Sequence, residues 1–206
     1  MKCSLDYERD SRRQGFLRVV GIDEAGRGPL AGPVVAAAVV LPGDFHHDDL
    51  NDSKKLTARQ RESLFAELTA RVDIQWAMAV VEAEEVDRLN ILEATHEAMR
   101  RALAGLIPDP DHALIDGLPV LPFPIPQTAL VGGDGLSFSI AAASVIAKVT
   151  RDRIMVEMDA RYPGYEFAQH KGYGTALHRA KLRAHGPCAI HRKSFSPVRQ
   201  AVLPLV

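Results

Sequence analysis

Two adjacent acidic residues close a hydrophobic stretch near the N-terminus of the chain. Residues 19–32 read VVGIDEAGRGPLAG, so Asp23 and Glu24 follow apolar residues and precede the Gly-Arg-Gly triplet of residues 26–28. Carboxylates at the edge of a hydrophobic core need a partner, and a divalent cation is a natural one. The triplet adds a cation and accessible backbone amides. The segment therefore predicts a site that handles a metal ion and a phosphate together.

Two further acids follow short apolar stretches that have the length of a strand. Asp116 follows residues 113–115, and Asp134 follows residues 128–131 after two glycines. Ligands at the ends of neighbouring strands converge at one edge of a sheet. Four carboxylates gathered there would repel one another unless cations lay between them, and their hard oxygen atoms favour Mg²⁺ or Mn²⁺ over zinc. Two such ions roughly 3.5–4 Å apart activate a water and stabilise a leaving oxygen in phosphodiester cleavage.

Other interpretations of these residues stay open at this point. A solvated turn also fits Asp23 and Glu24, and aspartate beside glycine, as at Asp116 and Asp134, is a common turn residue. Because adjacent residues of a strand point to opposite faces, the first two acids share a site only where the strand ends or twists, as Gly26 allows. The same geometry disfavours a glycosidase, which needs two opposed acids. The sequence holds neither a dinucleotide-binding glycine pattern nor a P-loop pattern.

The charge of the chain is unevenly distributed along its length. The net charge is −1 over 206 residues, but residues 1–147 carry 14 Lys and Arg against 22 Asp and Glu, and residues 148–206 carry 11 against 4. Residues 167–199 hold seven Lys and Arg, four His and no acid. This asymmetry favours a polyanionic partner for the C-terminal third, above all nucleic acid. The alternative is a helix whose charged face only meets solvent.

Three loop motifs fit the same kind of partner. Lys54 and Lys55 form a basic pair before a predicted helix, and Tyr173 follows a lysine and a glycine. Residues 191–195 read HRKSF and again place an aromatic residue beside charge, as nucleic-acid surfaces often do. In the alternative interpretation the lysines are merely exposed, and Tyr173 packs a surface turn onto the core.

The hydrophobic pattern predicts a mixed sheet covered by helices. Apolar runs predict the strands, and helical spacing behind the capping residues Thr57 and Asn90 predicts two of the helices. In chain order the expected elements are strands 17–23 and 34–41, helix 58–72, strand 74–81, helix 91–106, strands 113–115 and 128–131, and helices 140–162 and 175–184.

The cysteines and the apolar runs indicate the compartment. Cys3 and Cys188 are far apart and lack the spacing of metal ligands, so a reducing compartment fits. The N-terminal residues are charged and lack the apolar core of a signal peptide. The longest apolar run, residues 34–41, is too short to span a membrane. We therefore expect a soluble cytoplasmic protein without membrane contact.

With these motifs in this order, the chain resembles the bacterial type 2 ribonucleases H, the ribonuclease HII family. The matching segments span roughly residues 17–198 and read GIDEAGRGPLAGPV, NDSKKL, LNIL, LIDG, GD at 133–134, AASVIAKVTRD, FAQHKGY and HRKSF followed by PV. The resemblance implies an RNase H-like α/β fold, with a mixed five-stranded sheet flanked by helices and a helical C-terminal region. We expect a polar, poorly ordered lead-in over 1–16, a catalytic domain over 17–165 and a basic helical region over 166–206.

The resemblance also implies an activity, a cofactor and a partner. The family cuts the RNA strand of RNA–DNA hybrids, and it cuts on the 5′ side of single ribonucleotides embedded in duplex DNA. The products carry 3′-hydroxyl and 5′-phosphate ends, and the cofactor is Mg²⁺ or Mn²⁺, with two ions expected during catalysis. A monomer is expected.

The family's functional residues map onto this chain one by one. Its metal-binding and catalytic acids correspond to Asp23, Glu24, Asp116 and Asp134. Its substrate-binding residues correspond to Gly26, Arg27, Gly28, Lys54, Lys55 and Tyr173. Within the second set, the Gly-Arg-Gly triplet and the tyrosine read the ribose 2′-hydroxyl, and the lysines contact backbone phosphates.

The chain departs from the family's pattern around Asp134. A lysine commonly stands two residues before this aspartate, where the chain has Gly132. Ser or Ala and then Lys or Arg commonly follow it, where the chain has Gly135 and Leu136. The four acids are intact, and the changes bear on how rigidly Asp134 is held and how a phosphate is gripped near it.

Two rival functions make different predictions. A non-catalytic nucleic-acid-binding module would use only the basic region, so Asp116 and Asp134 would tolerate substitution. A related metal nuclease of DNA repair would cut all-DNA substrates, so Arg27 and Tyr173 would not decide the choice of sugar. Separately, residues 200–205 loosely resemble the short peptides that dock on bacterial sliding clamps, and the alternative is a terminus that packs on the domain.

Overall fold

A five-stranded mixed sheet with the order β3-β2-β1-β4-β5 forms the centre of the computed structural model, which describes residues 3–50 and 56–202. β2 (Val34–Val40) pairs antiparallel with β1 (Val19–Ala25), and β3 (Gln75–Val81) pairs antiparallel with β2. β4 (His112–Asp116) and β5 (Gln127–Leu130) add parallel strands on the other side of β1. The mixed five-stranded sheet expected from the sequence is confirmed.

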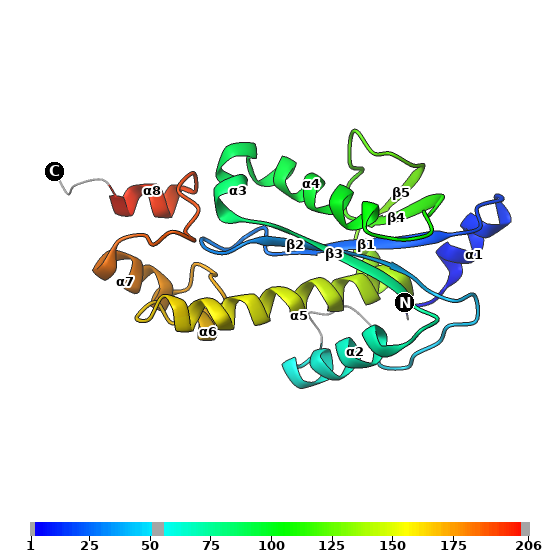
Figure 1. Ribbon diagram of the computed structural model, residues 1–206, viewed down its shortest axis with the longest axis horizontal. Coiled ribbons are helices and arrows are strands. Elements are labelled where there is room, and N and C mark those ends of the chain that lie inside the picture. Colours follow the sequence, from blue (N-terminus) through cyan, green and yellow to red (C-terminus); the bar gives the residue numbers. More distant parts are fainter. Residues whose placement is uncertain (1–2, 51–55, 203–206) are drawn as a thin grey trace.

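Helices cover both faces of this sheet (Figure 1). One face carries α3 (Ala83–Leu89) and α4 (Ile91–Ala104). The opposite face carries α2 (Ala58–Ala70) and the long α5 (Phe138–Arg161). The sheet is therefore the middle layer of a three-layer molecule, and α5 runs along most of its length.

The sequence of β2 shows why the sheet is covered twice. Val35, Ala37 and Val39 belong to the core cluster that contains the buried residues of α5, whereas alternate residues of the strand pack in the cluster around α4. A strand buried on both faces reads as a continuous apolar run, here VVAAAVV. Small alanine side chains let both helices approach the strand closely.

Two helices begin at the predicted caps. The Thr57 side chain accepts a hydrogen bond from the Gln60 amide at 3.3 Å, and the Gln60 side chain accepts from the Thr57 amide at 2.9 Å, which completes a capping box. Asn90 Oδ1 accepts from the amides of Leu92 and Glu93 at 2.9 and 3.1 Å. Local side-chain chemistry thus fixes the starts of α2 and α4.

Four short helices of the described residues were not predicted. The expected irregular lead-in over 1–16 is wrong for α1 (Asp6–Arg13), whose face toward the body is polar and so leaves no apolar stripe in the sequence. α3 is only seven residues long, and α6 (Phe167–His170) has four, so neither is long enough to show a helical period. The expected short tail is in fact helical in α8 (Ser196–Val202).

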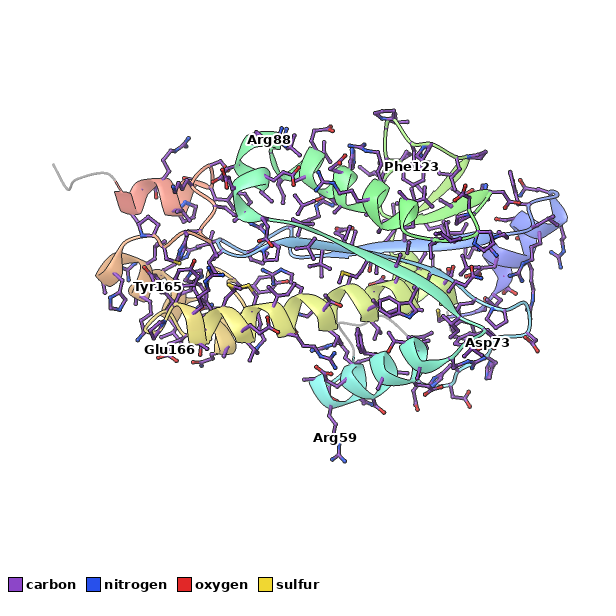
Figure 2. All side chains as sticks on the ribbon, in the orientation of Figure 1. Arg59, Asp73, Arg88, Phe123, Tyr165 and Glu166 are labelled. Carbon is purple, nitrogen blue, oxygen red and sulfur yellow. The ribbon has the colours of Figure 1, made fainter. Side chains whose placement is uncertain are left out.

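The C-terminal helices lie at the end of the molecule opposite α1 (Figure 1). They comprise α6, α7 (Ala176–His185) and α8, so the predicted helical C-terminal region is confirmed. Figure 2 shows Tyr165 and Glu166 where the chain enters this region. The division of the chain at residues 165 and 166 into two units stays a prediction. Across the described ranges, no helix is both long and apolar enough to cross a membrane.

Candidate active site

Three of the predicted acids line one cavity of about 250 Å³. Asp23 and Glu24 come from β1, and Asp116 ends the neighbouring parallel strand β4. The β1–β4 pairing stops at Ile22 and Ile115, whereas β1 continues beside β2 to Ala25. The last residues of β1 are therefore uncovered on the β4 side, and both adjacent acids reach the same cavity although β1 does not end between them.

The carboxylates of this cavity repel one another, and a bound cation would offset the repulsion. Asp23 is 4 % exposed, and burial together with the charges of Glu24 and Asp116 raises the pKa of its carboxyl well above the usual range. Hydrogen bonds from the Ser144 side chain and from the Glu24 amide, the latter 2.7 Å from Asp23 Oδ1, partly offset this increase. The oxygen-rich donor set fits a hard divalent ion such as Mg²⁺ or Mn²⁺.

Asp134 does not line this cavity. It is buried in a 3₁₀ turn, Gly133–Gly135, which follows the end of β5 at Leu130, one residue before the expected strand end at 131. The turn nevertheless contacts the acids, because the Gly133 amide donates a 2.7 Å hydrogen bond to Asp116 Oδ1. Among the residues that the structure describes, no three carboxylate, histidine or cysteine side chains form a group able to hold a metal ion. The four-acid ligand set therefore stays a prediction.

The predicted substrate-reading residues form another wall of the same cavity. Residues 26–28 and Tyr173 line it together with the acids, and the Tyr173 ring would lie 4.0 Å from a Cβ placed on Gly28. Tyr173 is 41 % exposed, so it does not pack on the core as in the alternative interpretation. The Arg27 guanidinium lies 3.5 Å from Glu24 Oε1 and is half exposed.

A buried guanidinium holds the loop that carries Arg27. Arg192 is fully buried and donates hydrogen bonds to the carbonyl oxygens of residues 26, 27, 29 and 32 at 2.6 to 3.0 Å. Burial and the charge of Arg151 lower the pKa of Arg192 to about 9. The carbonyl dipoles thus hold the guanidinium without a directly paired carboxylate, and they tie the Gly-Arg-Gly triplet to the C-terminal region.

Arg151 supports the same loop from α5. Its guanidinium is also fully buried and donates to the carbonyls of Pro33, Ala31 and Lys171 at 2.9, 3.1 and 3.0 Å. A Cβ on Gly26 would lie 2.2 Å from Arg151 Nε, and the φ of Gly26 is +103°. Glycine is therefore required there by both space and backbone conformation. The sequence motifs contain both arginines but give no sign of this structural role.

A chain of neutral histidines fixes the backbone of Tyr173. His178 Nδ1 lies 3.0 Å from the Tyr173 carbonyl oxygen and must carry the proton, because a carbonyl only accepts. His178 Nε2 then accepts from His191 Nε2 at 3.1 Å, and His191 Nδ1 accepts from the Cys188 amide at 3.0 Å. Burial, followed by the charge of a neighbouring histidine, lowers the pKa of both His178 and His191 to about 4, so both are neutral at neutral pH.

Comparison with known proteins identifies the family of the chain. The family model described as Ribonuclease HII matches residues 20–198. The chain belongs to the ribonuclease HII family. It is 55 % identical to Ribonuclease HII of Syntrophotalea carbinolica over 95 % of this chain and 93 % of that protein. It is 54 % identical to Ribonuclease HII of Geobacillus thermodenitrificans, over 95 % of this chain and 75 % of that protein.

Solved structures agree with this assignment. The ribonuclease H2 from Pyrococcus horikoshii superimposes with a TM-score of 0.74 at 26 % identity, over 90 % of this chain and 97 % of that one. RNase HII in the PCNA complex from Archaeoglobus fulgidus gives a TM-score of 0.63 at 28 % identity, over 82 % and 88 % of the two chains. The predicted RNase H-like fold is thereby confirmed, and the chain is an enzyme of the ribonuclease H class.

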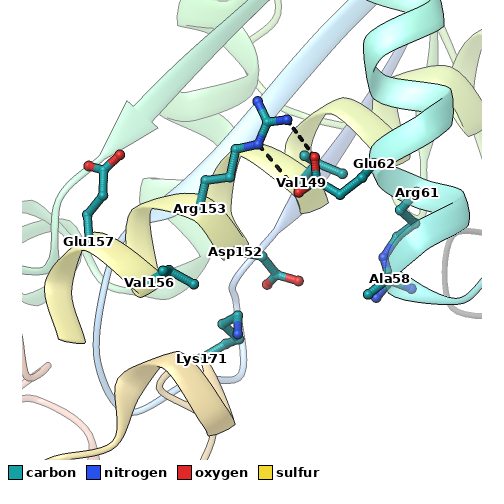
Figure 3. Close-up of a pocket in the computed structure, with 9 residues that line it drawn as sticks. All are labelled: Ala58, Arg61, Glu62, Val149, Asp152, Arg153, Val156, Glu157 and Lys171. Carbon is teal, nitrogen blue, oxygen red and sulfur yellow. Dashed lines mark hydrogen bonds and ion pairs between the residues drawn. The ribbon is translucent and has the colours of Figure 1, made fainter. Parts of the chain in front are cut away.

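Three further polar residues of this ribonuclease HII chain line the acid cavity and were not singled out in the sequence. They are Arg61, Ser144 and Lys148. Arg61 also lines a second cavity, of about 490 Å³, which lies between α2 and α5 (Figure 3). In Figure 3 the Arg153 guanidinium on α5 pairs with Glu62 on α2, at 2.5 Å. Isolated polar residues on amphipathic helices give no sequence signal that separates them from ordinary surface residues.

The two lysines of the basic loop pair fall outside the described part of this ribonuclease HII chain. Lys54 and Lys55 lie within residues 51–55, so their assignment to backbone phosphates stays a prediction. The described residues that follow form α2, whose Arg59 points away from the body of the molecule in Figure 2.

Proposed function

We propose that the protein is a divalent-metal-dependent endoribonuclease that cleaves RNA within a DNA duplex. Its substrates are the RNA strand of RNA–DNA hybrids and single ribonucleotides embedded in duplex DNA, cut on their 5′ side to give 3′-hydroxyl and 5′-phosphate ends. The observation that carries the proposal is the convergence of Asp23, Glu24 and Asp116 on one cavity whose other wall holds the Gly-Arg-Gly triplet and Tyr173. The residues proposed to bind metal and those proposed to recognise the ribose therefore line the same cavity.

The carboxylates would hold the metal ions in this proposal. Asp23, which is 4 % exposed, would hold them together with Glu24 and Asp116, and Asp134 in the neighbouring turn would complete the ligand set. When bound, Mg²⁺ or Mn²⁺ supplies the Lewis acidity that activates a water and stabilises the leaving 3′ oxygen. Since burial raises the pKa of Asp23, this side chain must lose its proton before it can serve as a ligand.

The opposite wall would select the sugar. The 2′-hydroxyl, which both donates and accepts hydrogen bonds, is what distinguishes ribose from deoxyribose at a site. Gly28, where a Cβ would meet only the Tyr173 ring at 4.0 Å, leaves the backbone beside Arg27 open to close approach. The phenol of Tyr173 adds a donor and a ring for stacking. Arg192 binds the carbonyl oxygens of Arg27 and Gly26 in this wall, and Arg151 binds those of Ala31 and Pro33 further along the same loop.

A cleavage assay with matched duplexes tests the proposal. The protein is incubated with duplex DNA that contains one ribonucleotide, beside an all-DNA duplex of the same sequence, in Mg²⁺, Mn²⁺ or EDTA. We expect a single cut on the 5′ side of the ribonucleotide in either metal and none in EDTA. Cleavage of the all-DNA duplex at a similar rate would instead support a DNA-repair nuclease, and metal-independent cleavage would overturn the two-metal mechanism.

Substrate binding would depend on the basic surface of α7. Arg179 and Arg183 are exposed and Lys181 is partly exposed, whereas His178 and Leu182 of the same helix are buried. If this face follows the duplex backbone, replacement of the three basic residues by glutamate weakens duplex binding for all sequences. Binding of the wild type also weakens as salt rises, because each phosphate contact releases counterions from the duplex.

Titration of a labelled duplex at several salt concentrations measures both effects. Reversal of Arg88, an exposed arginine on α3 at another part of the surface (Figure 2), is the control and should leave affinity nearly unchanged. An unchanged affinity and salt dependence in the triple variant would mean that α7 only meets solvent.

A sliding-clamp contact is a further part of the proposal. The relative from Archaeoglobus fulgidus was solved in a PCNA:RNase HII complex. In this chain the clamp-like residues 200–205 extend beyond the described part, which ends at residue 202. The contact therefore stays a prediction for this protein, and it rests on the C-terminal peptide alone.

A further inference from the structure

One buried carboxylate lies outside the acid cavity and makes an unusual set of contacts. Glu8 of α1 is 1 % exposed, and its Oε1 accepts three hydrogen bonds, from Ser137 Oγ at 2.6 Å, Ser139 Oγ at 2.6 Å and the Ser139 amide at 2.9 Å. Its Oε2 has no hydrogen-bond partner among the residues that the structure describes. Burial of a carboxylate is costly, and here a single oxygen atom makes all the compensating contacts.

These contacts connect α1 to the acid cavity through three consecutive hydrogen-bonded links. Ser137 Oγ donates to Glu8, the Ser137 amide donates to the Gly133 carbonyl at 2.9 Å, and the Gly133 amide donates to Asp116 Oδ1 at 2.7 Å. The same Gly133 precedes Asp134 in the chain. The orientation of one cavity acid, and the place of the fourth predicted acid, thus depend on a turn that Glu8 holds.

The turn has little rigidity of its own. Three of residues 132–135 are glycine, and the family's common lysine and its small or basic residues are absent around Asp134. Gly133 cannot be replaced by a stiffer residue, because a Cβ there would lie 2.7 Å from Ile140 Cδ1 and 3.1 Å from Leu130 Cβ. Glycine carries a large backbone entropy, so an ordered turn of this composition requires contacts from outside.

The N-terminal segment supplies those contacts at a second point as well. The Ser4 amide donates to the Leu136 carbonyl at 3.1 Å, and the Phe138 amide donates to the Ser4 carbonyl at 2.9 Å. Cys3 and Leu5, on either side, are buried in the core cluster that also contains Phe138. The residues that immediately follow the Asp134 turn are therefore bound to the N-terminal segment through both backbone and side chain.

We propose that Glu8 is a positioning residue for the metal-binding carboxylates, acting through Ser137 and Gly133 on Asp116 and on the turn that carries Asp134. Glu8 touches neither substrate nor metal. The inference rests on the proposed function for the role of the acids, but the geometry of the turn does not depend on that role. Through these contacts α1 would help to position the active-site acids. The lysine and the Lys or Arg that commonly flank this aspartate in the family are Gly132 and Leu136 in this chain.

Three variants separate this role from a general loss of stability. Glu8→Ala removes all three contacts at Oε1. Glu8→Gln keeps an oxygen acceptor at that position and serves as the conservative rescue, since Oε2 has no partner to lose. Asp10→Ala is the matched control for removal of an acidic residue from α1, because Asp10 is exposed and pairs with Arg13 on the surface.

Two measurements do not require cleavage. In the metal-free protein, hydrogen exchange of the Gly133 amide reports the bond to Asp116, and we expect at least roughly tenfold faster exchange in Glu8→Ala. Calorimetric titration with Mn²⁺ is expected to show roughly tenfold weaker binding in Glu8→Ala, a size typical for removal of a residue that orients metal ligands. Glu8→Gln and Asp10→Ala should stay within about threefold of the wild type in both.

Cleavage kinetics complete the test. Below the unfolding temperature of every variant, Glu8→Ala is expected to lower kcat roughly tenfold at a fixed Mg²⁺ concentration, with an unchanged KM for the duplex. Glu8→Ala with a lower melting temperature but wild-type Gly133 exchange and Mn²⁺ affinity would overturn the proposal, because Glu8 would then only stabilise the fold. A wild-type protein that fails to cleave would overturn the proposed function, whereas Gly133 exchange would still decide whether Glu8 holds the turn.

Discussion

Replacement of Asp23 by asparagine is expected to lower cleavage by on the order of a hundredfold or more, while the affinity for the duplex changes little. Asp23 is buried at the centre of the three acids, so its loss removes a carboxylate proposed to hold the metal ions. The basic residues of α7 are untouched. Single-turnover cleavage at one ribonucleotide, beside a binding titration in EDTA, measures the two properties separately.

Asp73→Asn is the matched control for this experiment. Asp73 lies in the turn between α2 and β3, away from the acid cavity, and pairs with Arg71 at 2.7 Å (Figure 2). It should cleave like the wild type. An Asp23→Asn protein with activity within tenfold of the wild type would contradict the proposed role of Asp23 as a metal ligand.

The same variant should change how stability depends on pH in the absence of metal. Burial, Glu24 and Asp116 raise the pKa of Asp23 in the folded protein above its unfolded value, which is about 4. The stability that this group contributes is therefore fully present below about pH 4 and is lost as pH rises through the folded-state pKa. In EDTA, the free energy of unfolding of the wild type should fall relative to that of Asp23→Asn over this interval. Parallel pH profiles for the two proteins in urea denaturation would contradict the raised pKa.

The elements that follow from local chemistry could be predicted from the sequence. The VVAAAVV run and the caps Thr57 and Asn90 give strands and helix starts whose signals lie within a few residues. The pairing of β1 with β4 then brings Asp23 and Asp116 together, as the strand-end pattern indicated. The strand before Asp134, expected over 128–131, is also found, as β5 over Gln127–Leu130, whereas the 3₁₀ turn that buries Asp134 was not predicted because its glycines carry no helical pattern.

The buried residues that hold the loops around the cavity could not be predicted from local sequence patterns. Arg192 and Arg151 look like two more cations in basic segments, yet both are buried and bind carbonyl oxygens of a loop more than a hundred residues earlier in the chain. Glu8 looks like one charge in a polar helix. The role of each depends on which distant backbone groups the fold brings beside it, and no local pattern encodes that.

The second large effect is expected at Tyr173, where alanine should lower cleavage at a lone ribonucleotide by more than it lowers duplex binding. The backbone of Tyr173 is held by His178, and its ring is 41 % exposed on the cavity wall facing Gly28. Loss of one good polar contact is worth about 1–3 kcal/mol, or roughly ten- to a hundredfold in rate. Because the ring lies in the cavity rather than on α7, the helix proposed to bind the duplex, most of this loss should appear in the cleavage step.

Tyr173→Phe separates the two contributions of this side chain, since it keeps the ring for stacking and removes the hydroxyl proposed to bind the sugar. A rate close to that of Tyr173→Ala would assign the effect to the hydroxyl, and a rate close to the wild type would assign it to the ring. Tyr162→Phe, at a tyrosine outside the cavity, is the control and should have no effect. The rates are compared at one ribonucleotide under saturating enzyme. Unchanged rates in both Tyr173 variants would mean that sugar choice is made elsewhere, leaving the Gly-Arg-Gly loop held by Arg192 as the remaining structural basis for it.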